Sequence, residues 1–76
     1  MAVRNRYVIG QGPDIACLDR EAGVTTLDLF GEGDAAWVLL RVPANRIDRV
    51  KACFRGICHV YETAEEARRV WQVFGR

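Results

Sequence analysis

The sequence predicts an α+β domain: a mostly antiparallel sheet of four to five strands with two helices packed on one face, in the order β-β-β-β-α-β-α. Three observations predict this class. Over the first forty residues, short runs of strand-forming residues alternate with turns that contain glycine or proline. Two segments nearer the C-terminus carry apolar residues at helical spacing. The chain has 76 residues, 50% hydrophobic and 28% charged, which suits a single small domain over residues 1–76.

The first three strands are expected to form a meander. They lie at residues 5–9, 15–19 and 24–30 and are separated by turn-forming segments. Gly23 suits the positive φ angle of a hairpin loop between the second and third strands. Regular alternation in the third strand places Thr25, Leu27 and Leu29 on one face of the sheet and Thr26, Asp28 and Phe30 on the other.

Residues 35–42 form a continuous apolar run that suits either a central strand or a short helix capped by Asp34. We favour a strand because Pro43 biases the residue before it toward extended backbone. The aliphatic side of this strand, which should face the helices, consists of Val38, Leu40 and Val42. Trp37 then lies exposed beside Arg41 on the opposite face, and the alternative is that Trp37 closes a small core or sits in a helix.

A short helix is expected after Asn45, which suits an N-cap, with Asp48 near the positive end of the helix. Its apolar positions are Ile47, Val50 and Phe54. Gly56 suits the left-handed position that ends many helices. A strand at residues 57–61 follows.

The last helix has the clearest signals. Residues 63–66, Thr-Ala-Glu-Glu, match a capping box, and Glu65 lies four residues before Arg69 on the polar side. The apolar stripe ends before Gly75 and consists of Ala67, Val70, Trp71 and Phe74. We expect the core to include Phe54, Val70, Trp71 and Phe74.

The cysteine content bears on the compartment. Cys17, Cys53 and Cys58 are an odd number, whereas extracellular disulfide scaffolds usually have an even and denser set. No apolar run resembles a secretory signal or a membrane span. We therefore expect reduced thiols in a cytoplasmic protein, and no membrane partner. The spacing Cys-x4-Cys-His is not a usual zinc pattern, and neighbours on a strand point to opposite faces, so no metal or cofactor is expected.

Charge is separated along the chain, although the net charge is only +1. Residues 14–34 carry a net charge of −5 and residues 35–61 carry +4. The candidate acidic binding residues are Asp14, Asp19, Glu21, Asp28, Glu32 and Asp34. The candidates on the sheet face and in the basic segment are Trp37, Arg41, Arg46, Arg49, Lys51 and Arg55. Such a separation can orient an approaching partner.

The sequence does not predict an enzyme. His59 is the only histidine, and the carboxylates lie in turns where nothing indicates the burial that shifts a pKa. Gly10-Gln11-Gly12 is followed by Pro13 and lacks the third glycine of a dinucleotide-binding fingerprint. We expect no catalytic residues.

Residues 55–61, Arg-Gly-Ile-Cys-His-Val-Tyr, partly resemble the RNA-recognition-motif signature. The matching positions are Arg55, Gly56 and Val60. Ile57 and His59 stand where that family has base-stacking aromatic residues. The strand at residues 38–43 and the helix after it are also similar to that family's first strand and helix.

In size and single-domain plan, the chain resembles small α+β proteins of bacteriophages and mobile elements, including anti-CRISPR proteins. A terminal strand followed by a Thr-x-Glu-Glu-Ala helix, here at residues 62–70, recurs in such proteins. The resemblance implies a stoichiometric inhibitor that binds one protein complex and performs no chemistry.

The leading hypothesis is a non-catalytic protein-binding module, an inhibitor of a bacterial nucleic-acid-processing complex of the CRISPR type. Its acidic segment would meet a basic surface of that partner. One alternative is a small nucleic-acid-binding module that uses the basic segment Arg41–Arg55, with Trp37 as a stacking platform. The other is a small regulatory homodimer.

Overall fold

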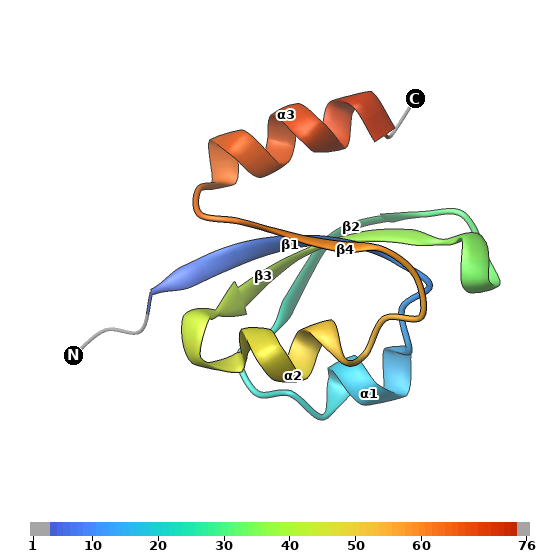
Figure 1. The fold of residues 1–76 in the computed structure, drawn as a ribbon, viewed down its shortest axis with the longest axis horizontal. Helices are drawn as coiled ribbons and strands as arrows, with labels where there is room; N and C mark the ends of the chain where they lie inside the picture. The colour runs from blue at the N-terminus through green and yellow to red at the C-terminus, as the bar shows by residue number, and fades with distance from the viewer. Residues whose placement is uncertain (1–3, 75–76) are drawn as a thin grey trace.

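The computed structural model describes residues 4–74 and confirms the α+β class, with a four-stranded antiparallel sheet in the order β2-β3-β1-β4 (Figure 1). The strands are β1 Asn5–Gln11, β2 Thr25–Phe30, β3 Trp37–Pro43 and β4 Cys58–Tyr61. The helices are α1 Ile15–Asp19, α2 Ile47–Lys51 and α3 Ala64–Phe74. Two short 3-10 turns, η1 Gly33–Ala35 and η2 Ala44–Arg46, precede β3 and α2. Within residues 4–74, no helix has both the length and the apolar character needed to span a bilayer.

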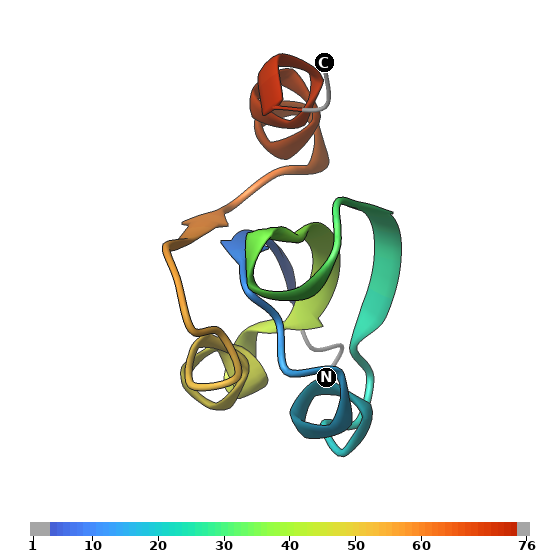
Figure 2. The same cartoon turned by 90° about the vertical axis from the view of Figure 1, so that its right-hand side faces the viewer.

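The two central strands are apolar on both faces, and this pattern decides where the helices lie. In β1, Val8 belongs to the core cluster on the side of α1 and α2, while Ile9 belongs to the cluster under α3. In β3, Leu40 and Leu39 divide in the same way. Both faces therefore need a cover, which α3 provides on one side and α1 with α2 on the other (Figures 1 and 2). This corrects the expectation that the helices share one face.

Residues 15–19 form α1 instead of the expected second strand. Asp14 caps this helix, because its carboxylate oxygen Oδ1 accepts a hydrogen bond from the Cys17 amide at 3.1 Å. Leu18 is the one buried residue of the helix and anchors it to the core below the sheet. Gly23 has the expected positive φ of 81°, but it connects α1 to β2 and not two strands of a hairpin.

The ends of α2 also differ from the expectation. Asn45 lies inside the turn η2, and the N-cap of α2 is Arg46, which makes no capping hydrogen bond with its side chain. The helix already ends at Lys51, and Gly56 has no positive φ. Gly56 instead lies against Gln11, where an added Cβ would come within 2.9 Å of Oε1. Its lack of a side chain therefore serves close packing and not a helix end.

Phe54 follows α2 and is not part of it, contrary to the expected helical spacing. The half-buried ring of Phe54 packs over Gly10 of β1, so tightly that no Cβ fits at this glycine. Phe54 also forms an isolated antiparallel bridge with Pro13.

A β-bulge between Thr26 and Asp28 breaks the expected alternation of β2. Thr26 pairs with Leu40, whereas Asp28 pairs with Leu39. Residues directly opposite each other share a face, so Thr26 and Asp28 lie on different faces of the sheet, not on the same one. Asp28 consequently faces α3.

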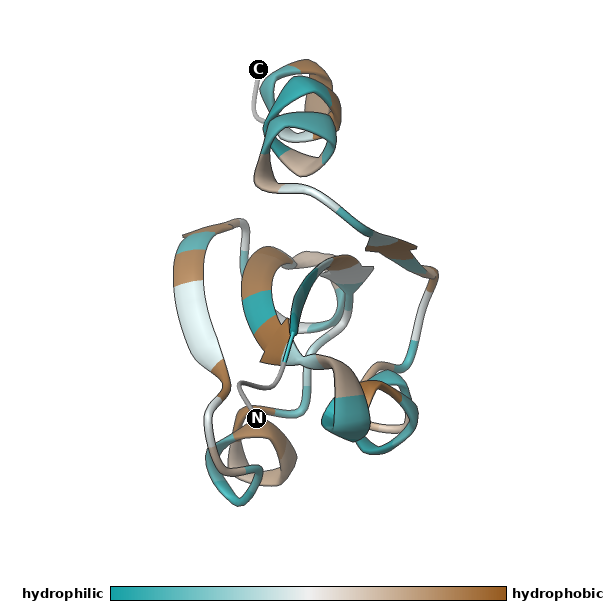
Figure 3. Ribbon diagram, turned by 90° about the vertical axis from the view of Figure 1, so that its left-hand side faces the viewer, coloured by the Kyte–Doolittle hydropathy of each residue, from teal (hydrophilic) through white to brown (hydrophobic). Residues whose placement is uncertain are grey.

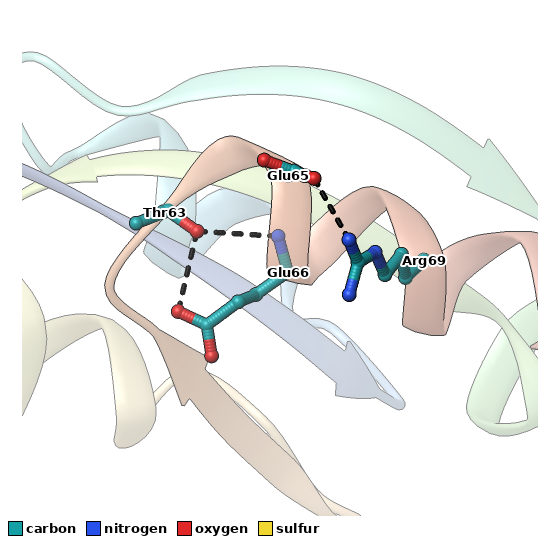
Figure 4. Close-up of polar contacts among 4 residues, drawn as sticks. All are labelled: Thr63, Glu65, Glu66 and Arg69. Atoms are coloured by element: carbon teal, nitrogen blue, oxygen red, sulfur yellow. Dashed lines mark hydrogen bonds and ion pairs between the residues drawn. The ribbon is translucent and has the colours of Figure 1, made fainter.

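The start of α3 confirms Thr63 as the expected cap, and Glu66 bonds to the hydroxyl of Thr63 (Figure 4). The Glu66 amide donates to Thr63 Oγ1 at 3.2 Å, and the Thr63 hydroxyl donates to Glu66 Oε1 at 3.2 Å. Arg69 pairs with Glu65 at 2.8 Å along the outer side. Figure 3 shows α3 with both hydrophilic and hydrophobic segments, as an amphipathic helix requires. Gly75, before which the helix was expected to end, lies outside the described residues.

The apolar stripe of α3 packs on the sheet as expected along most of its length. Ala67 and Trp71 are buried, and Val70 is half-buried. Phe74 lies at the end of the helix with 37% of its surface exposed, so it is not a core residue. Its ring stacks on Trp37, with the centroids 4.6 Å apart. Trp37 is therefore half-buried at the edge of α3, and the expected exposed indole on an open sheet face is a wrong prediction.

A hydrogen bond joins α3 to the edge strand β2. The indole nitrogen of Trp71 donates to Asp28 Oδ2 at 2.8 Å, and the Leu29 amide donates to Asp28 Oδ1 at 2.8 Å. The bond from Trp71, and then the bond from the Leu29 amide, hold the pKa of Asp28 below the usual range of a carboxyl group. The ring of Phe30 lies 5.1 Å from that of Trp71. The indole thus combines apolar burial with a satisfied donor.

A disulfide bond joins Cys17 of α1 to Cys53, which follows α2, with their Cα atoms 5.6 Å apart. Cys58 is the free cysteine. The expectation of three reduced thiols is therefore wrong for this pair. The pairing depends on α1 being a helix beside α2, a juxtaposition that a strand at residues 15–19 does not suggest.

Replacing Trp71 by alanine should lower the free energy of unfolding by about 3–5 kcal/mol, because the indole is buried between α3 and the sheet. Phenylalanine at the same position should cost less, since it keeps most of the apolar contact but loses the hydrogen bond to Asp28. Urea denaturation of both variants measures this. An alanine variant as stable as the parent would contradict the packing of α3.

The Asp28 carboxylate should contribute to stability in a pH-dependent manner. Since its pKa is lowered in the folded chain, the contribution is present above the unfolded pKa of about 4 and is lost as the pH falls through the folded pKa. The parent should therefore be more stable than Asp28→Asn at pH 7, and the difference should shrink below about pH 4. Urea denaturation across this range tests it, and a difference independent of pH would refute the role of the charge.

Candidate functional site

A groove of about 350 Å³ is lined by residues at the start of α1 and around the end of β2. Three separate parts of the chain line it. They are residues 13–15, several residues between 29 and 36, and Arg55. The turn between β2 and β3 forms one side of the groove. Its tight course depends on Gly31, whose φ is 86° and where an added Cβ would lie 3.1 Å from the Cα of Ala36.

The apolar part of the groove comes from two aliphatic side chains. Ile15 of α1 is 52% exposed and Leu29 of β2 is 50% exposed. They come from different elements and line one hollow, so they present apolar surface that a partner can cover.

The charged part of the groove consists mainly of carboxylates. Asp14, Glu32 and Asp34 line it together with Arg55, which gives three negative charges against one positive charge. Arg55 Nη1 lies 3.1 Å from Asp34 Oδ1, and both side chains are largely exposed, so this ion pair is strongly screened by water. Asp14 uses Oδ1 as the cap of α1, which leaves its other oxygen for a further partner. The groove thus has a net charge of −2.

Backbone hydrogen bonds hold the sides of the groove in place. The Asp14 amide donates to the Cys53 carbonyl at 2.7 Å, and the Arg55 amide donates to the Gly12 carbonyl at 3.0 Å. The Gly12 amide donates to the Ala36 carbonyl at 2.9 Å. Residues far apart in sequence are therefore positioned by main-chain contacts, and the groove is formed before any partner binds.

The other predicted acidic residues lie elsewhere. Asp28 faces α3 and accepts the hydrogen bond from Trp71. Glu21 pairs with Arg46 at 3.8 Å. Asp19 is exposed at the end of α1 and does not line the groove. The acidic segment of the sequence is therefore only partly one surface.

The basic segment is divided between the two faces of the sheet. Arg41 lies on the side of α3, where it and Arg68 line a cavity of about 80 Å³. Arg49 and Lys51 belong to α2 on the opposite side. Arg46 is paired with Glu21, and Arg55 lies in the acidic groove. The predicted basic residues do not gather on one face.

The outer edge of β2 runs alongside the groove. An unpaired edge can accept a further strand, but a bulge disfavours this pairing. β2 carries such a bulge, and the Asp28 carboxylate accepts the Leu29 amide. The edge of β2 is therefore poorly suited to the addition of a further strand.

No histidine or cysteine lines the groove, so its chemistry is ionic and apolar contact. In residues 4–74, no group of three or more His, Cys, Asp or Glu side chains is arranged to hold a metal ion. Cys58 does not line the groove, and burial raises the pKa of its thiol against the opposing effect of Lys51.

Two groove residues, Ile15 and Leu29, were not among the predicted site residues. A signal for Ile15 exists in the sequence, since Asp14 is a good N-cap and indicates a helix that begins at the next residue. No local signal identifies Leu29, because its neighbours in the groove come from α1 and from residue 55.

No protein-family model matches this chain, and no curated protein or solved structure shows significant similarity to it. The partial likenesses to the RNA-recognition motif and to anti-CRISPR proteins stay predictions from the sequence.

Proposed function

We propose that the chain is a non-catalytic protein-binding module whose groove takes a basic, aliphatic segment of a partner protein. One observation carries this proposal. Carboxylates at positions 14, 32 and 34 surround two half-exposed aliphatic side chains, although they come from separate parts of the chain.

Charge complementarity decides the chemistry of the partner. A groove with a net charge of −2 attracts lysine and arginine side chains and repels phosphate groups. The exposed Ile15 and Leu29 favour aliphatic neighbours of those basic side chains. At about 350 Å³, the groove is near the lower end of the 300–1,000 Å³ typical of small-ligand sites, so it holds a short stretch of the partner.

The nucleic-acid alternative has less support. The basic residues on which it depends lie on both faces of the sheet, and two of them are paired with carboxylates. The half-buried Trp37 already stacks on Phe74, which occupies a face that a base would need.

A protein that handles nucleic acids fits the partner chemistry, since such proteins expose basic segments. The more specific proposal, a phage or mobile-element inhibitor of a CRISPR-type complex in the bacterial cytoplasm, rests on the resemblance of residues 62–70 and of the overall plan. The lining of the groove supports a partner of basic and aliphatic chemistry, whichever protein that partner is.

The chemistry can be tested with labelled peptides of equal length in a fluorescence anisotropy assay. The three probes alternate lysine with leucine, glutamate with leucine, and lysine with serine. We expect only the lysine–leucine peptide to bind, and more tightly at low salt. Preferential binding of the glutamate–leucine peptide or of single-stranded DNA would contradict the proposal.

Glu32→Lys should weaken binding of the lysine–leucine peptide by about two- to tenfold, because it removes an attraction and adds a repulsion at an exposed rim. Asp19→Lys is the matched control, since it makes the same charge change on α1 outside the groove. Leu29→Ser should weaken binding as well, whereas Val73→Ser, at a position 78% exposed on α3, should not.

Equal losses in Glu32→Lys and Asp19→Lys would mean that the peptide responds to overall charge and not to the groove. Sedimentation of the unliganded chain separates a further case: a dimer that Glu32→Lys dissociates would make a second copy of the chain the occupant, against the proposal.

A further inference from the structure

We propose that the Cys17–Cys53 disulfide regulates the groove. The intact disulfide holds α1, which contributes one side of the groove, in its binding position, and reduction releases α1. This inference rests on the proposed function for its effect on binding. Its effect on α1 is independent of any partner.

The helix that the disulfide holds, α1, is short and has few other attachments. α1 has five residues, far fewer than a helix needs for stability on its own. Leu18 is its only buried residue. Ile15, the apolar groove residue of α1, lies two residues before Cys17. The position of Ile15 therefore depends both on the hydrogen-bonded Asp14 before it and on the disulfide at Cys17 after it.

Besides the disulfide, the remaining attachments of α1 are the packing of Leu18 in the core and backbone hydrogen bonds at the start of the helix. The Asp14 amide stays bonded to the Cys53 carbonyl, and the Arg55 amide to the Gly12 carbonyl. Both bonds involve residues that precede α1 in the chain, Gly12 and Asp14. Reduction should therefore loosen α1 locally and leave the sheet and the opposite groove wall in place.

The reduction is a thiol–disulfide exchange with a low-molecular-weight thiol as the reductant. Cys17 is only partly buried, whereas Cys53 is 2% exposed, so the thiolate of the reductant attacks the Cys17 sulfur. The Cys53 thiolate leaves and takes up a proton. A second reductant molecule attacks the mixed disulfide, releases Cys17 as a thiol and forms the oxidised, dimeric reductant. Two electrons pass from the two reductant thiols to the protein.

The third cysteine does not compete in this exchange. Burial raises the pKa of the Cys58 thiol, and this effect exceeds the opposing influence of Lys51. At neutral pH the group is mainly the thiol, which is a poor nucleophile compared with a thiolate. Cys58 therefore serves as an internal reference.

The first measurements need no partner. Alkylation and mass spectrometry should count one free thiol in the air-oxidised chain and three after reduction. In ¹⁵N relaxation, the order parameters of residues 15–18 should fall from about 0.85 to below about 0.6 on reduction, while β1 and β3 keep values near 0.85. Cys17→Ser/Cys53→Ser should behave as the reduced chain, and Cys58→Ser as the oxidised one.

Binding of the lysine–leucine peptide should then weaken about three- to tenfold on reduction, the loss expected when α1 is correctly placed only a third to a tenth of the time. Cys58→Ser should retain this response, and the double variant should lose it. If the double variant does not fold, the reduced parent chain gives the same comparison.

Three outcomes would overturn the inference: three free thiols in the oxidised chain, unchanged order parameters in α1, or a loss of order in β1 and β3 together with α1. The last would make the disulfide a staple of the whole fold. Absence of peptide binding in both redox states, with α1 loosened by reduction, would refute the proposed groove function and leave the redox control of α1 standing.

Discussion

The whole structure depends on a sheet whose two central strands are apolar on both faces. Val8 and Ile9 in β1, and Leu40 and Leu39 in β3, direct neighbouring side chains to opposite sides. A chain of 76 residues must cover both sides with little helix. One side is covered by α3, whose Trp71 also reaches Asp28 on the edge strand. The other side is covered by two helices of five residues each, and a disulfide joins Cys17 of α1 to Cys53, which follows α2.

The candidate site lies at the edge of the layer that α1 and α2 form on one face of the sheet. α1 buries Leu18 but leaves Ile15 half exposed beside Leu29, at the point where β2 turns toward β3. Asp14 begins the helix as its cap, and the turn contributes Glu32 and Asp34. The apolar surface, the negative charge and the disulfide thus occur together because this side of the sheet is covered by short helices and turns.

Local patterns predict much of the fold but only part of the site. The strands near residues 5–11, 25–30, 37–43 and 58–61 follow from composition and from Pro43, and α3 follows from its capping box. The strand predicted at residues 15–19 is wrong because a segment of five residues is too short to show the periodicity that separates a strand from a helix. The bulge in β2 cannot be recognised in the sequence, where Thr26 and Asp28 fit the regular alternation of a strand. Counting charge by segment cannot reveal that Asp14 and Asp34 line the same groove, since backbone hydrogen bonds between residues distant in sequence position them.

On the proposed function, a basic, aliphatic segment of a partner binds between α1 and the turn after β2. Titrating ¹⁵N-labelled oxidised protein with the lysine–leucine peptide, and mapping the chemical-shift changes, tests this most directly. The changes should concentrate at Ile15, at Leu29 and across residues 31–34, and α3 should be unaffected. Changes centred on Arg49 and Lys51 of α2, or on Arg41 and Arg68 on the opposite face, would contradict it.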